Sequence, residues 1–193
     1  MKLVIQIPCL NEESTLPVTL KSIPARIDGI DTIELLVIDD GSSDETSRIA
    51  KQNGVNHIIR FNRTVGLARA FKAGIEKAVG LGADIIVNTD ADNQYDNADI
   101  PKLIKPILDK KADIVIGNRE ILRNMRQGLT KGLLQFLGSR VVSRLSGINI
   151  GDATSGFRAF SREAALQLNI STDFSYTLES IIQAGEKGLI VTD

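Results

Sequence analysis

Short apolar runs alternate with helix-like stretches along the first part of the chain, at a spacing of roughly 25 residues. Each apolar run is continuous and does not alternate with polar residues, which is typical of strands that are covered on both faces. The pattern therefore predicts an α/β protein whose mainly parallel sheet has helices on both faces. The expected strands are Leu3–Ile7, Ile33–Ile38, His57–Phe61, Ile85–Thr89 and Ile114–Ile116.

Helices are expected between these strands. Ser42 and Glu45 have the spacing of a capping box, which predicts that the second helix begins at about Asp44. Pro8 is expected to stop the first strand, and Gly80 the third helix. The expected helices are Leu16–Ile23, Asp44–Asn53, Val65–Val79 and Ile100–Lys110.

Length and composition indicate one globular domain. The chain has 193 residues and a net charge of −1, so it has no strong attraction for nucleic acid. Cys9 is the only cysteine, and no disulfide can form within the chain. No run of about 18 apolar residues is present to span a membrane. The first residues lack the layout of a signal peptide, so we expect a cytoplasmic protein.

Beyond Gly117 the alternation ends, and a basic helical stretch is expected at about Met125–Leu145. Residues 119–144 contain six Lys and Arg against one acid, Glu120, so this segment carries +5 and the rest of the chain −6. A basic helix with a broad apolar side can lie in a membrane interface, or it can pack that side on the sheet. The glycine-rich residues 146–156 and then residues 157–168 are expected to attach to the same sheet.

Polar residues follow the expected strands at the points where the chain leaves the sheet. Ligands of open α/β sheets bind beyond the carboxyl ends of the strands, so these residues form one candidate site. Carboxylates brought together repel one another, and a bound divalent cation removes that repulsion. The residues are Pro8, Asn11, Glu12, Asp39, Asp40, Asp90, Asp92, Gln94 and Arg119.

Asp90-Ala91-Asp92 is the candidate metal site. In extended backbone, residues i and i+2 point to the same side, so the two carboxylates face one way, and Gln94 adds a third oxygen. Such hard oxygen ligands suit Mg²⁺ or Mn²⁺, bound together with the phosphates of a substrate. The alternative interpretation is that these aspartates cap a turn or a helix.

Several other classes of site are poorly supported. The chain has no Gly-x-x-x-x-Gly-Lys loop and no Gly-x-Gly-x-x-Gly after the first strand, which argues against a nucleoside triphosphatase and a dinucleotide oxidoreductase. It has no His/Cys zinc cluster. His57 and Cys9 are the only residues of their types. His57 is expected to be a packing or surface residue and Cys9 a small buried residue, so a Ser-His-Asp or Cys-His hydrolase is not favoured.

Six short motifs occur in an order that resembles the family 2 glycosyltransferases of the GT-A fold, over nearly the whole chain. The closest likeness is to the branch that acts on polyprenyl phosphates. The family resemblance also implies further elements after Asp193. The motifs are Pro8-Cys9-Leu10-Asn11-Glu12, Asp39-Asp40-Gly41-Ser42-Ser43-Asp44, Asn62 to Arg69, Asp90-Ala91-Asp92-Asn93-Gln94, Gly117-Asn118-Arg119 and Asp152-Ala153-Thr154-Ser155-Gly156-Phe157-Arg158.

The resemblance implies a site for a nucleotide-sugar donor. Pro8, Asn11 and Glu12 would line the nucleoside pocket, Asp40 would recognise the base, and Arg69 would contact the diphosphate. The resemblance does not decide between a UDP-sugar and a GDP-sugar. It implies that residues 1–118 form the nucleotide-sugar-binding half of a single domain, and residues 119–193 the acceptor-binding half.

The resemblance also assigns the reacting groups. Asp90 would contact the donor, Asp92 and Gln94 would hold Mg²⁺ or Mn²⁺, and Asp152 lies where the family has its candidate catalytic carboxylate. If the acceptor is a lipid phosphate, its oxygen is already an anion, so Asp152 need only orient or tune the site. A hydroxyl acceptor would require Asp152 as a general base. The alternative is that Asp152 caps the glycine-rich loop.

On the acceptor side, the resemblance implies that Arg119, Lys131 and Ser139 hold the phosphate of a polyprenyl phosphate. Arginine suits such contacts because its guanidinium binds phosphate oxygens in pairs. With residues 119–144 at a membrane surface, the enzyme would act at the cytoplasmic face and invert the anomeric carbon. The competing interpretations are a family 2 transferase for a saccharide or protein hydroxyl, a nucleotidyltransferase, and a non-catalytic nucleotide-sugar-binding module.

Overall fold

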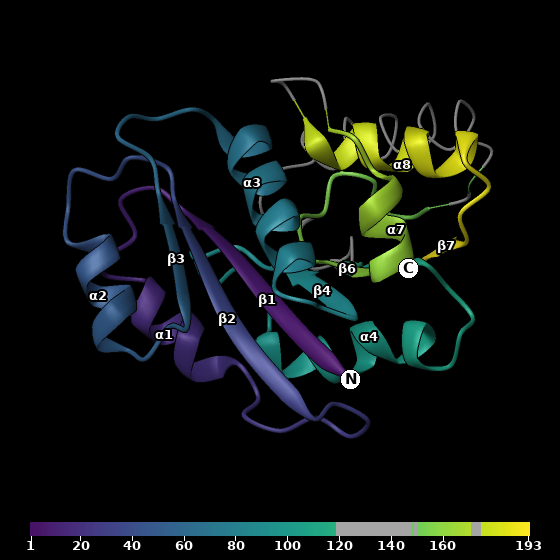
Figure 1. Cartoon of the computed structure of the whole chain (residues 1–193), viewed down its shortest axis with the longest axis horizontal. Helices are drawn as coiled ribbons and strands as arrows, with labels where there is room; N and C mark the ends of the chain where they lie inside the picture. Colours follow the sequence, from purple (N-terminus) through teal and green to yellow (C-terminus); the bar gives the residue numbers. More distant parts are fainter. Residues whose placement is uncertain (119–147, 149, 171–174) are drawn as a thin grey trace, which may run out of the picture.

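The computed structural model describes residues 1–118, 148, 150–170 and 175–193. Seven strands in these ranges form one sheet in the order β3-β2-β1-β4-β6-β5-β7 (Figure 1). The strands are β1 Lys2–Cys9, β2 Thr32–Asp39, β3 His57–Arg60, β4 Ile85–Asn88, β5 Ile114–Ile116, β6 Arg158–Ser161 and β7 Val191–Thr192. The helices are α1 Leu16–Ser22, α2 Thr46–Gln52, α3 Leu67–Gly80, η1 Asn97–Asp99 (a 3-10 turn), α4 Ile100–Leu108, α7 Arg162–Gln167 and α8 Tyr176–Glu186.

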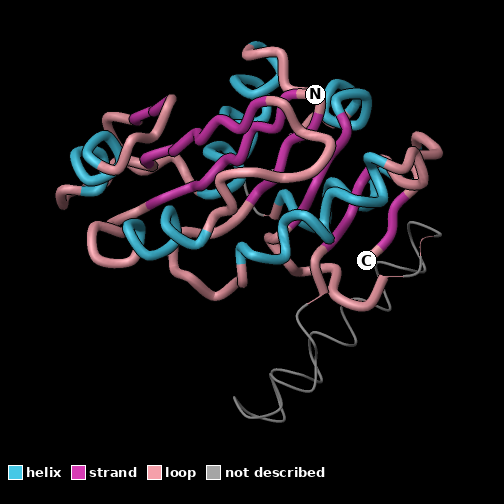
Figure 2. The backbone as a smooth tube through the Cα atoms, turned by 90° about the horizontal axis from the view of Figure 1, so that it is seen from below, coloured by secondary structure: helices cyan, strands magenta, loops and turns pink. Residues whose placement is uncertain are grey.

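Helices cover both faces of the sheet, as Figure 2 shows edge-on. Alternate residues of a strand point to opposite faces, and β1 divides its side chains accordingly. Leu3, Ile5 and Ile7 pack with α1, α2 and α4, whereas Val4 packs with α3, α7 and α8. The two buried clusters account for the continuous apolar runs in the sequence, and the predicted fold class is confirmed.

The sheet is mainly parallel, with one strand inserted in the opposite direction. β1 pairs in parallel with β2 and β4, and β2 with β3. β6 lies antiparallel between β4 and β5, while β7 is parallel to β5. β6 and β7 come from the second part of the chain, so both parts build one sheet.

The chain leaves this sheet after β5 and returns to it at β6. Gly117 N–H donates to Phe157 O at 2.7 Å, so the two ends of this excursion are hydrogen-bonded to each other. The predicted helix at Met125–Leu145 lies outside the described residues. The stretch 157–168 contains β6 followed by α7. Neither α8 nor β7 was predicted, because β7 has only two residues and the apolar pattern of α8 is weak.

Two predictions of local structure are wrong. Pro8 does not stop the first strand, which continues to Cys9 beside β2. On its other side β1 pairs with β4 only as far as Gln6, so no strand there needs the N–H that proline lacks. Ser42 and Glu45 do not form a capping box. Glu45 is the N-cap of α2 without a side-chain cap bond, and the Ser42 hydroxyl instead accepts a hydrogen bond from Asn11 N–H.

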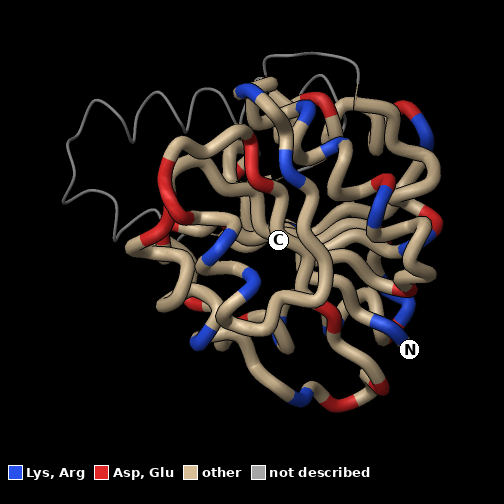
Figure 3. Tube along the Cα trace, turned by 60° about the vertical axis from the view of Figure 1, so that its left-hand side comes forward, with Lys and Arg blue, Asp and Glu red and all other residues tan. Residues whose placement is uncertain are grey.

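Charged residues of both signs are interspersed over the described part of the chain (Figure 3). Some form ion pairs, such as Lys2 with Glu34 at 2.8 Å. None of the helices in the described ranges has the length and apolar character that a membrane-spanning helix needs.

Candidate functional site

The carboxyl ends of four strands meet at one edge of the sheet. Cys9, the last residue of β1, pairs with Asp39, the last residue of β2. Gln6 of β1 pairs with Asn88 at the end of β4. Asn88 and Ile116 both pair with Arg158, which begins β6. The residues that follow each strand therefore converge on this edge, as the sequence predicts.

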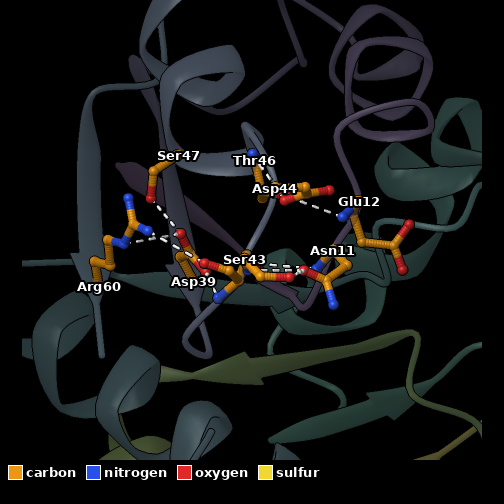
Figure 4. A network of polar contacts seen from close by, with 9 residues as sticks. Asn11, Glu12, Asp39, Ser43, Asp44, Thr46, Ser47 and Arg60 are labelled. Atoms are coloured by element: carbon orange, nitrogen blue, oxygen red, sulfur yellow. Dashed lines mark hydrogen bonds and ion pairs between the residues drawn. The ribbon is translucent and has the colours of Figure 1, made fainter. Parts of the chain in front are cut away.

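At the ends of β1 and β2, the two chain segments are joined by hydrogen bonds, and we call residues 9–13 and 39–47 the β1/β2 corner (Figure 4). Asn11 donates its N–H to Ser42 Oγ at 2.9 Å, and its Oδ1 accepts Ser43 N–H at 2.9 Å. Glu12 N–H donates to Thr46 Oγ1 at 2.8 Å. Asn11 has a φ of 58°, a left-handed conformation that asparagine tolerates better than most residues. The predicted nucleoside-pocket residues are thus fixed by their neighbours.

Asp39 is the buried anchor of this corner. Its side chain is fully buried and accepts Ser42 N–H at 2.8 Å and the Ser47 hydroxyl. Arg60 lies 3.6 Å away and forms an ion pair with the same carboxylate. A buried charge is stable only with such partners. The sequence placed Asp39 at a strand end but gave it no role.

Asp40 holds the loop that precedes α3. Its two carboxylate oxygens accept Val65 N–H at 2.7 Å and Gly66 N–H at 3.0 Å. Gly41 allows the close approach behind it, since a Cβ there would stand 2.5 Å from the carbonyl carbon of Arg63. Recognition of a base by Asp40, as predicted, would use the remaining lone pairs of these oxygens. The predicted diphosphate contact, Arg69, is exposed on the first turn of α3.

The residues after β4, numbers 88–96, form a second corner that we call the β4 corner. Asp90 is half-buried, whereas Asp92 and Gln94 are exposed. Gln94 N–H donates to Asp92 Oδ1 at 3.1 Å across a turn in which Asn93 has a φ of 59°. Asp92 therefore does cap a turn, which is compatible with the use of its other lone pairs for a ligand.

Asp152 is buried in the loop that leads into β6. Its Oδ1 accepts the hydroxyl of Thr154 at 2.8 Å and the N–H of Thr154 at 3.2 Å. The capping contact is therefore present, and it fixes the orientation of the carboxylate. Arg158, fully buried, donates to the carbonyls of Ala153 and Ser155 at 2.7 Å each and so holds the same loop.

Four carboxylates lie close enough to the buried Cys9 thiol to act on it. Burial raises the pKa of Cys9, and the nearby carboxylates of Glu12, Asp39, Asp44 and Asp90 raise it further. Three of these carboxylates lie in the motifs at the ends of β1 and β2, and one lies in the β4 corner. The field at this edge therefore favours a cation.

Asp44 is ionised more readily than a free aspartate. Partial burial opposes its charge, but hydrogen bonds from the Thr46 hydroxyl and from the N–H groups of Glu13 and Thr46 outweigh burial and lower the pKa of Asp44. Glu13 N–H donates at 3.1 Å and Thr46 N–H at 3.0 Å. Asp44 was not predicted as a site residue, although it is part of the second quoted motif.

The sequence profile described as glycosyl transferase family 2 matches residues 4–168. This chain belongs to glycosyltransferase family 2. The predicted family is confirmed, and the match covers both corners, the Asp152 loop and β6. The structure places the described parts of the quoted motifs at one sheet edge. The predicted acceptor residues Arg119, Lys131 and Ser139 lie outside the described residues.

Curated relatives of this family 2 glycosyltransferase include proteins named for transfer to polyprenyl phosphates. One is the UDP-N-acetylglucosamine–dolichyl-phosphate N-acetylglucosaminyltransferase of Methanococcus voltae, 32% identical over 82% of this chain and 68% of that protein. Another is the undecaprenyl-phosphate mannosyltransferase of Micrococcus luteus, 28% identical over 88% of this chain and 70% of that protein. An uncharacterized protein of Methanocaldococcus jannaschii is 35% identical over 97% of this chain and 77% of that protein.

Among solved structures, glucosyl-3-phosphoglycerate synthase of Mycobacterium tuberculosis has the same fold. It superposes with a TM-score of 0.78 at 22% identity and covers 99% of this chain and 67% of that chain. That enzyme was crystallised with Mn²⁺, uridine diphosphate and phosphoglyceric acid. This likeness establishes the GT-A fold for the family 2 chain.

The oxygen donors of the β4 corner fit a divalent cation that shares its coordination with a diphosphate. Among the residues that the structure describes, no three His, Cys, Asp or Glu side chains converge into a complete metal site. Mg²⁺ in nucleotide sites is typically bound by one or two carboxylates together with substrate phosphates. The half-buried Asp90 and the exposed Asp92 offer carboxylates of this kind in the β4 corner.

Proposed function

We propose that this chain is an inverting, metal-dependent hexosyltransferase that moves a sugar from a UDP- or GDP-sugar to a polyprenyl phosphate. The observation that carries the proposal is the convergence of the β1/β2 corner, the β4 corner and the Asp152 loop at one sheet edge. A donor of this class needs a nucleoside pocket, a diphosphate site and a reaction centre side by side, and the three regions match these needs.

In this proposal the donor lies across the two corners. Asn11 and Glu12, whose backbones are fixed by Ser42 and Thr46, line the nucleoside pocket beside Pro8. Asp40 recognises the base, and Arg69 reaches the diphosphate from α3. These residues bind the part of the donor that leaves, so they orient the sugar without taking part in the bond change.

Asp92 and Gln94, with Asp90 beside them, would hold Mg²⁺ or Mn²⁺ against the diphosphate. When bound, such a cation neutralises the charge that develops on the leaving diphosphate. Asp90 contacts the donor from a half-buried position. Rigid placement of these carboxylates is what makes the charge stabilisation effective, because no reorganisation is then needed during the reaction.

The role of Asp152 depends on the acceptor: a hydroxyl acceptor would need it as a general base, and a lipid phosphate would not. The oxygen of a lipid phosphate attacks as an anion, so Asp152 orients the site and tunes its charge. The bond from the anomeric carbon to the diphosphate oxygen breaks as the bond to the acceptor oxygen forms on the opposite face, which inverts the centre. The burial of Asp152 and its two bonds from Thr154 support an orienting role.

A polyprenyl-phosphate acceptor is supported by the names of the relatives from Methanococcus voltae and Micrococcus luteus. In this proposal, residues 119–193 form the acceptor half, with Arg119, Lys131 and Ser139 at the lipid phosphate. The basic residues 119–144 bring the enzyme to the cytoplasmic face of a membrane, where such acceptors lie.

The test begins with nucleotide binding. We expect UDP or GDP to raise the melting temperature in the presence of Mn²⁺. A ligand at 100 times its dissociation constant adds about 2.7 kcal/mol of stability, or roughly 5–10 °C for a domain of this size. An absence of any shift with both nucleotides contradicts the donor site.

The acceptor is then tested with a radiolabelled donor. Undecaprenyl and dolichyl phosphates should become labelled, and the anomeric configuration of the product, read by NMR, should be opposite to that of the donor. Labelling of an oligosaccharide in place of the lipid would support a hydroxyl acceptor. Binding of donor without release of nucleoside diphosphate under any condition would support a non-catalytic binding module.

A further inference from the structure

Both backbone polar groups of Gly156 are hydrogen-bonded to the chain segment that carries Asp90. Its carbonyl oxygen accepts the Nδ2–H of Asn88 at 2.8 Å, and its own N–H donates to the hydroxyl of Tyr95 at 2.9 Å. Asn88 is the last residue of β4, and Tyr95 closes the β4 corner, so the two partners flank the Asp90–Gln94 turn. The Asp152 loop and the β4 corner are therefore joined at Gly156.

The Asp90 carboxylate packs directly against Gly156. A Cβ placed on this glycine would stand 3.1 and 3.2 Å from the two carboxylate oxygens of Asp90, and 3.0 Å from the hydroxyl of Tyr176. These distances are shorter than ordinary contacts. A glycine is needed here for close approach, so the position of Gly156 sets how far the Asp90 carboxylate can move towards β6.

A buried polar chain holds Asn88 in one orientation. The Gly156 carbonyl requires a donor, so the Asn88 amide nitrogen faces it, and Asn88 Oδ1 faces the opposite way and accepts Gln6 Nε2–H at 2.9 Å. Asn88 Nδ2 also lies 3.2 Å from the Tyr176 hydroxyl. Gln6 and Asn88 are both fully buried. Polar groups in a sheet interior are costly unless satisfied. Both ends of the Asn88 amide are hydrogen-bonded, which fixes its orientation, whereas Gln6 Oε1 is buried without a hydrogen-bond partner among the described residues.

The ring of Tyr95 is fixed as well. It is buried and stacks on Phe157, the residue after Gly156, with ring centroids 5.3 Å apart and planes 16° from parallel. Its hydroxyl can therefore meet Gly156 N–H without moving. The ring and the hydroxyl are separable parts, because a phenylalanine would keep the stacking and lose only the hydrogen bond.

We propose that Asn88, Tyr95 and Gly156 form a positioning unit that sets the location of the Asp90 carboxylate relative to the Asp152 loop. The inference rests on the proposed function, in which Asp90 contacts the donor, and it adds three positioning residues to that site. Catalytic and binding groups must be held to within about 0.5 Å of their productive geometry. The unit supplies such control from buried residues that do not themselves touch the ligand.

The first test is Tyr95→Phe, with Ser161→Ala as the matched control. Ser161 is a buried hydroxyl at the other end of β6, where it accepts Ala164 N–H at 3.1 Å. Affinity for UDP and GDP is measured by calorimetry with and without Mn²⁺. We expect Tyr95→Phe to weaken Mn²⁺-dependent nucleotide binding by about five- to tenfold, the loss of roughly one hydrogen bond, and to leave metal-free binding unchanged. Ser161→Ala should leave both unchanged. Equal loss in the two variants would show a merely structural effect and overturn the inference.

A second measurement does not need a nucleotide. The carboxyl ¹³C resonance of Asp90, identified by its loss in Asp90→Asn, should shift in Tyr95→Phe and in Gly156→Ala, but not in Ser161→Ala. An Asp90 resonance that is unmoved in Tyr95→Phe overturns the inference, even if Gly156→Ala does not fold. If the unmodified protein binds neither nucleotide, the proposed function fails, while this resonance still decides whether the unit positions Asp90.

Discussion

The β1/β2 corner and the β4 corner lie on the same edge of the sheet, yet their polar side chains are held in different ways. In the β1/β2 corner, Asn11, Asp39 and Asp44 are bonded to the serines, threonines and backbone of the same corner. In the β4 corner, Asp92 and Gln94 are exposed on a turn, and the buried support comes from Asn88 and Tyr95 behind it. The first corner is therefore closed by its own hydrogen bonds around the buried Asp39, while the second presents Asp92 outward and keeps Asp90 half-buried.

The comparison indicates which side chains contribute mainly to the stability of the fold and which mainly to activity. A side chain that completes the protein's own hydrogen bonds costs stability when it is removed. Removal of an exposed side chain that binds a ligand lowers activity and leaves stability nearly unchanged. Substitutions in the two corners should therefore produce opposite patterns, and the following predictions test this contrast.

The largest effect is expected from Asp92→Ala in the β4 corner. Loss of a ligand to the cation should lower the transfer rate by about a hundred- to a thousandfold. The melting temperature should change by less than about 2 °C, because Asp92 is exposed. Steady-state kinetics and thermal unfolding measure the two quantities. Asp96→Ala, which removes a carboxylate from the same loop, should keep the rate within about threefold; a large fall in melting temperature for Asp92→Ala would contradict the contrast.

The opposite pattern is expected from Asp39→Ala in the β1/β2 corner. The change removes an acceptor from the buried Ser42 N–H, from the part-buried Ser47 hydroxyl and from the exposed Arg60, and it leaves the Ser42 N–H unsatisfied. We expect a loss of about 3 kcal/mol in the free energy of unfolding and a melting temperature lower by roughly 6–12 °C. Asp31→Ala, at an exposed aspartate, is the control. Equal stability of Asp39→Ala and the unmodified protein would show that this corner is not part of the core.

A smaller effect is expected from Ser42→Ala. The hydroxyl accepts Asn11 N–H at 2.9 Å, and its removal should cost about 1 kcal/mol, or roughly 2–4 °C. Because Asn11 lines the proposed nucleoside pocket, affinity for the nucleotide should also fall by about threefold. Ser43→Ala removes only an exposed hydrogen bond, from the Ser43 hydroxyl to Asn11 Oδ1 at 3.2 Å, and should change the melting temperature by less than about 1 °C. An effect of Ser43→Ala as large as that of Ser42→Ala would show that this hydrogen bond has no special part in the corner.

The smallest effect concerns pH. Hydrogen bonds lower the pKa of Asp44 below its unfolded value of about 3.9, so the ionised carboxylate stabilises the fold above that pH. The stabilisation is lost as the pH falls through the lower folded pKa. Asp44→Asn should therefore melt below the unmodified protein at pH 7, and the gap should narrow as the pH falls below the unfolded pKa. Thermal unfolding across this range measures the gap, and a gap independent of pH would contradict the assignment.

The sequence predicts the fold well because the strands carry strong and continuous apolar patterns. The run Ile114–Ile116 was predicted with the bounds that the structure has. The capping box failed because the same serine could accept either a helix N–H or the N–H of Asn11, some thirty residues away, and only the fold brings Asn11 near. Local patterns cannot weigh a local bond against a distant one.

The site was predicted in part for a related reason. Residues that follow strands are visible in the sequence, since strand ends mark the edge where ligands bind. The residues that support the site from behind cannot be recognised in the sequence in this way. Tyr95 and Gly156 lie 61 positions apart, and their link becomes visible only once β6 is inserted beside β4. Asn88 resembles any polar residue at the end of a strand until its partners on both sides are known.

The hydrogen bond between Gly117 and Phe157 has a consequence for how such enzymes diversify. A connection whose two ends meet can change its length cheaply, because each doubling of a flexible loop adds only about 0.6 kcal/mol of closure cost. The stretch between Gly117 and the Asp152 loop can therefore be replaced, while the Asp152 loop keeps its hydrogen bonds to the β4 corner. A new acceptor would then need no change in the donor-binding residues, and a chimera that is joined at Gly117 and Gly151, and so keeps Asp152 and Gly156, is the natural way to transplant acceptor choice between relatives.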